Sequence, residues 1–121
     1  MPLFTFEEER ASVIAAITPV VHGASTCAEL AQAIADNMAD WRESPDPDRR
    51  ARLDAIMAAA ADAQRHQSVA EQALAVVQVQ SGHANMADLL NAIGTAAGHA
   101  ARALGRTIEA SKSQFDDEHA G

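Results

Sequence analysis

The sequence predicts an all-α protein, an antiparallel helical bundle of three to four helices that contains a long Ala-rich helical hairpin at about 47–112. Alanine, which has the highest helix propensity, supplies 29 of the 121 residues. Apolar residues recur at intervals of three and four, the period of one helix face. Breaks that contain Pro or Gly divide this pattern into helix-sized segments. A chain of this length forms one domain, which we assign to residues 1–113, followed by an acidic C-terminal tail at 114–121.

The first third of the chain is expected to contain two helices, at about 6–17 and 27–41, separated by a connector with Pro19 and Gly23. Each helix begins with the sequence of a capping box, Thr-Phe-Glu-Glu for the first and Thr-Cys-Ala-Glu for the second. The second helix has an apolar stripe that consists of Cys27, Leu30, Ile34, Met38 and Trp41.

The remaining chain is expected to form the hairpin from helices at about 47–80 and 86–112. In the Ser-Pro-Asp-Pro-Asp break before it, Asp46 is placed to cap the helix and Pro47 to occupy its first position. Gly82 is the expected cap residue at the turn. The first hairpin helix has a seam whose positions alternate by three and four without a break. All of its residues except Gln67 are apolar: Leu53, Ile56, Ala60, Ala63, Gln67, Ala70, Leu74 and Val77.

A short connection makes the two hairpin helices antiparallel, which predicts their register. Leu74 should lie near Ile93 and Gln67 near His99. Gln67, as a polar residue in the seam, either fixes this register or lies at the solvated rim.

Small residues form a second stripe on the last helix. Three glycines within one helix each cost about 1 kcal/mol relative to alanine, so either another backbone approaches closely there or the helix is merely loosened. The first interpretation predicts an interaction surface that also includes a flank of the preceding helix: Gly94, Gly98, Ala101, Gly105, Val69, Ala73 and Val76.

The charge distribution disfavours nucleic acid as a partner. The net charge is −8, and residues 1–48 hold nine acidic side chains against Arg10 and Arg42. No signal peptide is visible, and no apolar run is expected to reach the roughly 18 residues of a membrane span. We therefore expect a cytoplasmic protein that binds no membrane, and the Ala bias favours a bacterial or phage origin.

No pattern in the sequence predicts catalysis, a cofactor or a metal site. None of the five histidines belongs to an HxxxH, HExxH or ExxH motif. Cys27 lies at the expected start of a helix, and His22 is close enough in sequence to act as its base. Cys27 also belongs to an apolar stripe, where a free cysteine packs as a small hydrophobe.

The run His99-Ala100-Ala101-Arg102-Ala103 resembles the His-x-Leu-Lys-Gly motif of histidine phosphotransfer domains, which are helical bundles of this size. Ala101, Arg102 and Ala103 replace the Leu, Lys and Gly of that motif. The resemblance implies His99 as the phosphoacceptor, with Arg102 as the neighbouring cation.

These observations favour a non-catalytic structural or adaptor protein that acts through helix–helix packing, either with itself as a homo-oligomer or with another protein. Two alternatives stay open. One is a signalling module of the phosphotransfer type with His99 as acceptor. The other is an acidic inhibitor that uses residues 1–48 to occupy a basic site on a partner.

Overall fold

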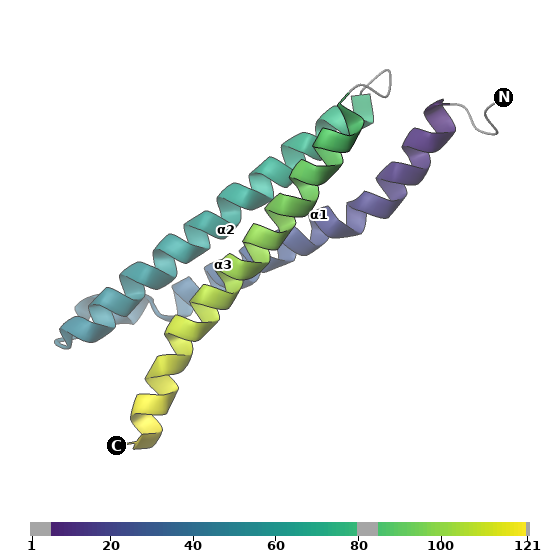
Figure 1. The fold of residues 1–121 in the computed structure, drawn as a ribbon. Helices are drawn as coiled ribbons and strands as arrows, with labels where there is room; N and C mark the ends of the chain where they lie inside the picture. Colours follow the sequence, from purple (N-terminus) through teal and green to yellow (C-terminus); the bar gives the residue numbers. More distant parts are fainter. Residues whose placement is uncertain (1–5, 80–84, 121) are drawn as a thin grey trace.

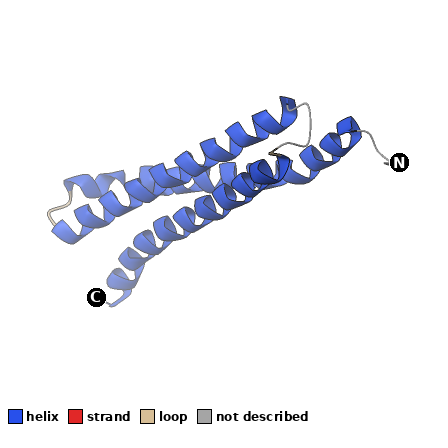
Figure 2. Ribbon diagram, turned by 45° about the horizontal axis from the view of Figure 1, so that its top comes forward, coloured by secondary structure: helices blue, strands red, loops and turns tan. Residues whose placement is uncertain are grey.

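The computed structural model describes residues 6–79 and 85–120, with side chains described up to Lys112. The elements are α1 (Phe6–Asn37), the short 3₁₀ helix η1 (Ala39–Glu43), α2 (Pro47–Val79) and α3 (Met86–Ala120). Helices account for 95% of the described residues, and no strand occurs among them, so the predicted all-α class is confirmed. Figures 1 and 2 show α1 and α3 running in the same direction and α2 running antiparallel to both. Each long helix contacts the other two.

The core of this bundle consists largely of alanine. The buried positions of α1 follow the 3-4 period from Val21 to Ala35, and those of α3 follow it from Ile93 to Thr107. Larger fully buried side chains are few: Leu53, Ile56, Val77, Ile93 and Thr107. Alanine at these positions lets the helix backbones approach closely, and it leaves most large apolar side chains at the edges of the helices.

The connector expected at residues 18–25 does not form, and α1 is one continuous helix through Pro19 and Gly23. Pro19 cannot donate to the carbonyl of Ala15, but both residues are exposed, so water can reach that carbonyl. The Thr18 hydroxyl donates to the Ile14 carbonyl at 2.6 Å and adds a local hydrogen bond there. The helix changes direction partway along its length but does not end (Figure 1).

The expected apolar stripe of residues 27–41 was only partly right in its orientation. Alanines 24, 28, 31 and 35 form the fully buried side of α1, whereas Leu30 is 51% exposed. The other four stripe residues are half-buried and pack against the core: Cys27, Ile34, Met38 and Trp41. Because Ala is as frequent as the larger residues here, periodicity alone did not show which of two adjacent stripes faces inward.

The break before α2 forms as predicted. The Asp46 carboxylate accepts a hydrogen bond from the Asp48 N–H at 2.9 Å, and Pro47 is the first residue of α2. At the other end of the hairpin, the Asn85 carbonyl accepts from the Leu89 N–H at 2.9 Å as α3 begins. The predicted caps at Thr5 and Gly82 lie outside the described residues.

The hairpin register is confirmed in part. Leu74 and Ile93 belong to one core cluster, as do Ala70 and Ala96. Gln67 does not meet His99. It faces α1 instead and donates to the Ser25 hydroxyl at 3.4 Å and to the Glu71 carboxylate at 3.0 Å. α2 packs against two helices, so its seam is shared between them and His66 takes the position opposite His99.

The last helix is longer than the sequence suggested. The acidic tail was expected to follow a helix end near residue 112, but the backbone of α3 remains helical to Ala120. The segment contains neither Pro nor Gly before Gly121, so no residue interrupts the helix.

Candidate interaction surfaces on two sides of α3

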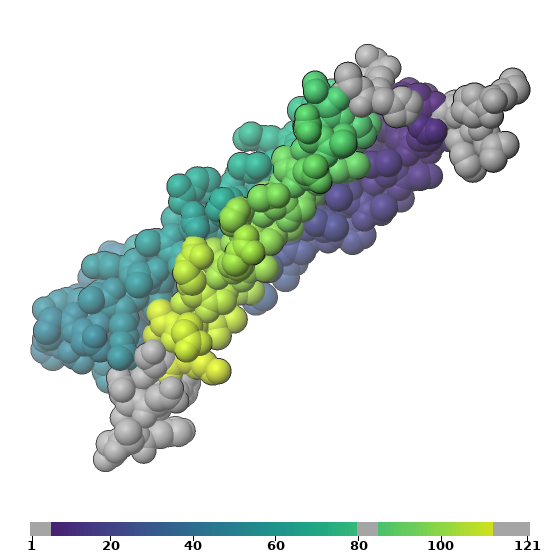
Figure 3. All heavy atoms as spheres, viewed as in Figure 1, coloured from purple at the N-terminus to yellow at the C-terminus, as the bar shows by residue number. Residues whose placement is uncertain are grey.

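α3 separates two surfaces of different character. Figure 3 shows α3 between α2 on one side and α1 on the other. We call the outer surface shared by α1 and α3 the α1–α3 face. Its members follow the helical period on the sides of these helices that point away from α2: Val20, Gly23, Cys27, Leu30 and Ile34 on α1, and Leu90, Gly94, Ala97, Gly98, Ala101, Gly105 and Ile108 on α3.

The α1–α3 face is apolar and lacks charge along most of its length. Residues 11–28 of α1 and 89–101 of α3 contain no Asp, Glu, Lys or Arg. Three acids of α1, Glu7 to Glu9, lie in its first turn, and its other two, Glu29 and Asp36, line a hollow against α2. Leu30 and Ile108 project from the face with 51% and 41% of their surface exposed. These two side chains are the largest apolar groups that the fold leaves uncovered there.

The glycine stripe of α3 lies on this face and is open. A Cβ atom built on Gly94 or Gly105 would meet nothing within 4 Å, and one on Gly98 would meet only the Arg102 side chain at 3.9 Å. The close backbone approach predicted for this stripe is therefore not made by α1 or α2. Its role as an interaction surface stays a prediction.

The first helical segment of the chain is also strongly apolar. The helical segment Phe6–Glu43, which comprises α1 and η1, contains an 18-residue window of mean hydropathy 1.4, of which 17% is buried, so by length and composition it could cross a membrane. The expectation that no run reaches this length was wrong, because Ala, Thr and Ser fill the gaps between larger apolar residues without adding charge. Core helices of soluble proteins also meet this criterion, so the window alone does not establish a membrane segment.

The other surface is the groove between α2 and α3, which we call the α2–α3 groove. Val69 of the predicted interaction surface lines this groove and is 43% exposed. Val76 is two turns further along the same side of α2 and is 46% exposed. Ala73, predicted with them, is only 8% exposed and belongs to the core. The predicted surface residues are thus divided between two separate surfaces and the core.

A polar cluster occupies the middle of the α2–α3 groove. The rings of His66 and His99 stack with their centroids 4.7 Å apart and their planes inclined by 28°. Asp62, one turn before His66, accepts from Arg65 and from Arg106, each at 2.6 Å. Position 66 could not be singled out from sequence, because its importance depends on the register that places it opposite His99.

The surroundings of His99 bear on the phosphoacceptor hypothesis. Arg102 lies where the resemblance implied, with its Nη2 3.0 Å from His99 Nδ1. A guanidinium can only donate, so in this contact Nδ1 is the acceptor and the proton of a neutral ring resides on Nε2. Arg102 thus lies near enough to be the cation that the resemblance implied, and the phosphoacceptor role of His99 stays a prediction.

The structure does not bring Cys27 and His22 together. Five residues along a helix correspond to about 140° of rotation. His22 lines a hollow against α2 with Ser25 and Glu71, whereas Cys27 packs at the edge of the core on the α1–α3 face. Among the described residues no group of three or more His, Cys, Asp or Glu side chains is arranged to hold a metal ion.

Comparisons with known proteins give no independent guide. No protein-family model matches the chain, and neither a curated protein nor a solved structure matches it. The fold and its surfaces define a three-helix bundle with an alanine core, and the functional argument rests on its geometry.

Proposed function

We propose that the protein is a non-catalytic assembly or adaptor protein that acts by helix–helix packing, and that its α1–α3 face is covered by a helix of a second copy or of another protein. The observation that supports this most is the apolar α1–α3 face, which is uncharged over residues 11–28 and 89–101, has three open glycines, and exposes Leu30 and Ile108 beyond the uncharged stretches. Small residues at a helix surface allow another helix to approach closely, and neighbouring large side chains then fill the space between.

Burial of apolar side chains would supply the favourable energy of this contact. Burying a Leu or Ile side chain contributes about 1.5–3 kcal/mol. A symmetric dimer would bury both residues twice, because a two-fold interface uses the same patch on each subunit. Such a contact would also explain the three glycines. Without it, they lower helix propensity on an exposed surface with no compensating gain.

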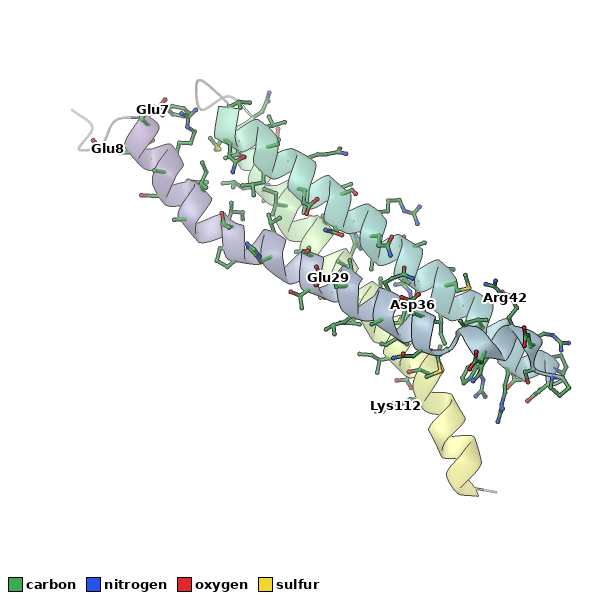
Figure 4. All side chains as sticks on the ribbon, turned by 180° about the vertical axis from the view of Figure 1, so that it is seen from behind. Glu7, Glu8, Glu29, Asp36, Arg42 and Lys112 are labelled. Carbon is green, nitrogen blue, oxygen red and sulfur yellow. The ribbon has the colours of Figure 1, made fainter. Side chains whose placement is uncertain are left out.

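The two alternatives have less support. For the phosphoacceptor alternative, the resemblance covers five residues, and His99 is the one residue identical to the motif. The acidic side chains of α1 do not gather into one patch either. Glu7 and Glu8 lie at its N-terminal end, and Glu29 and Asp36 lie in its second half, as Figure 4 shows. An inhibitor that occupies a basic site would need these charges to converge on one surface.

Sedimentation velocity tests the proposal. The wild type should be larger than a monomer at micromolar concentration, or should become so in the presence of its partner protein. The double variant Leu30→Glu/Ile108→Glu should be monomeric and at least 100-fold weaker in association, with unchanged helicity by circular dichroism. Val76→Glu is the matched control, because Val76 has similar exposure but lies on α2, on the same side as Val69.

Two results would contradict the proposal. One is association that survives in the Leu30→Glu/Ile108→Glu variant. The other is a wild type that is monomeric and captures no protein partner. We place this assembly in the cytoplasm without membrane contact, so the protein should not float with phosphatidylcholine or phosphatidylglycerol vesicles. Flotation that is lost in the same double variant would show that lipid, not protein, covers the face.

A further inference from the structure

The geometry points to a second binding site: the α2–α3 groove accommodates an amphipathic helix that carries acidic side chains, supplied by a partner protein. This site shares no residue with the α1–α3 face and goes beyond the self-association or adaptor contact proposed there. The argument rests on the shape of the groove, on its apolar positions and on the sign of its charge.

The groove offers two hollows in line, each of about 450 Å³. One is lined by Ala55, Ala58, Ala59, Asp62, Arg65 and Arg106. The other is lined by His66, Val69, Asp88, Asn91, Ala92, Thr95, Ala96 and His99. From Ala55 to Val76 the α2 edge spans roughly 30 Å at 1.5 Å per residue, which matches a helix of about 20 residues.

Apolar contacts are available at both ends of the groove. The small side chains of Ala55 and Ala58 are exposed at one end, and Val69 and Val76 are exposed at the other. A partner helix with apolar residues at intervals of three and four would bury both sets at once.

The middle of the groove is basic. Arg65 and Arg106 reach it from opposite helices, and Arg102 lies one turn from Arg106 beside the stacked histidines. Asp62 is the acid among them, and Asp88 lies at the far end of the second hollow. The acidic side chains of the chain are concentrated in residues 1–48, so an acidic helix is repelled there and attracted to the arginines of the groove.

Arg65 and Arg106 are held by Asp62 and still have N–H groups that can donate hydrogen bonds to a partner. Arg65 and Arg106 each place one Nη2 on Asp62, and a guanidinium carries five N–H donors. Their side chains are 69% and 55% exposed, so the remaining donors are accessible. Asp62 therefore holds the two guanidinium groups across the groove, where carboxylates of a docked helix would meet them.

A fluorescein-labelled synthetic peptide provides the probe. It has 20 residues, leucine at the 3-4 spacing of one face and glutamate on both flanks, and a matched peptide has lysine in place of glutamate. Fluorescence anisotropy should show binding of the glutamate peptide at least tenfold tighter than that of the lysine peptide. The preference should shrink between about 50 and 500 mM NaCl, because the Debye length falls over this range.

Variants locate the site. Arg65→Gln/Arg106→Gln should weaken binding of the glutamate peptide at least tenfold, and Val69→Asp should abolish it. Arg49→Gln/Arg50→Gln removes two arginines outside the groove and should leave it unchanged. Absence of binding up to 1 mM peptide, equal binding of the two peptides, or insensitivity to the groove arginines would overturn the inference.

The outcome is independent of the proposed function. Leu30→Glu/Ile108→Glu should abolish self-association and leave peptide binding intact. If the groove variants instead dissociate a homo-oligomer, the occupant of the groove is a second copy, and the partner-helix inference is overturned while assembly stands.

Discussion

The α1–α3 face and the α2–α3 groove border the same helix but are chemically opposite. Over the central part of α1 and α3, the face has no charged side chain, and its glycines leave open space. The groove contains an aspartate shared by two arginines and a stacked histidine pair. The difference follows from α2, which carries the ion-paired residues Asp62 and Arg65 and brings them only to the surfaces that it borders.

This contrast indicates how each surface gains affinity. A partner on the face gains from apolar burial and close backbone packing, which salt affects little. A partner in the groove gains from charge complementarity, which salt screens and which mainly sets specificity and association rate. Salt dependence is therefore the simplest experimental distinction between the two surfaces.

The largest expected effect is on association, and it comes from placing a bulky side chain on the α1–α3 face. Gly98→Leu should weaken association by about 1–3 kcal/mol, because a bulky side chain separates packed backbones. The free energy of unfolding of the dilute Gly98→Leu variant should change by less than about 1 kcal/mol, since the nearest atom to a Cβ at this position is the Nη2 of Arg102 at 3.9 Å. Concentration-dependent sedimentation and thermal melts measure the two quantities. A loss of several kcal/mol in the dilute protein would place Gly98 inside the fold.

A smaller effect of opposite sign is expected from alanine. Gly94→Ala and Gly105→Ala should each stabilise the dilute protein by up to about 1 kcal/mol through helix propensity, because their Cβ atoms meet nothing. The same substitutions should weaken association. If both variants stabilised the fold and left association unchanged, the glycines would have no packing role and would merely loosen the helix.

The smallest effect is expected in the groove. Asp62→Asn removes the partner of Arg65 and Arg106, but both arginines are exposed, so solvent screens the pairs. We expect a loss of at most about 1 kcal/mol in urea unfolding, smaller still in 0.5 M NaCl, and no change in self-association. A change in oligomeric state would show that the groove lies within the assembly.

The sequence predicted the helical hairpin and its start well, because Pro47 and Asp46 act locally and the α2 seam contains several large residues. It failed on the inward stripe of α1, where Ala28 and Ala31 compete with Leu30 and no rule of hydrophobicity favours the smaller side chains. It also failed at Pro19, because a proline whose missing hydrogen bond faces water bends a helix without ending it. The polar cluster in the groove depends on the register between α2 and α3. The predicted register was off by one residue, so it placed Gln67 opposite His99 where the structure has His66.

Thiol accessibility tests most directly the claim that the face is covered and the groove is open in the assembled protein. Ala101→Cys and Val69→Cys, each in a Cys27→Ser background, place one exposed thiol on each surface. As protein concentration rises from nanomolar to tens of micromolar, maleimide labelling of Cys at position 101 should slow at least tenfold. Labelling at position 69 should stay constant. Equal, concentration-independent rates at both positions, found for the protein alone and with its partner protein present, or slowing only at position 69, would contradict the account.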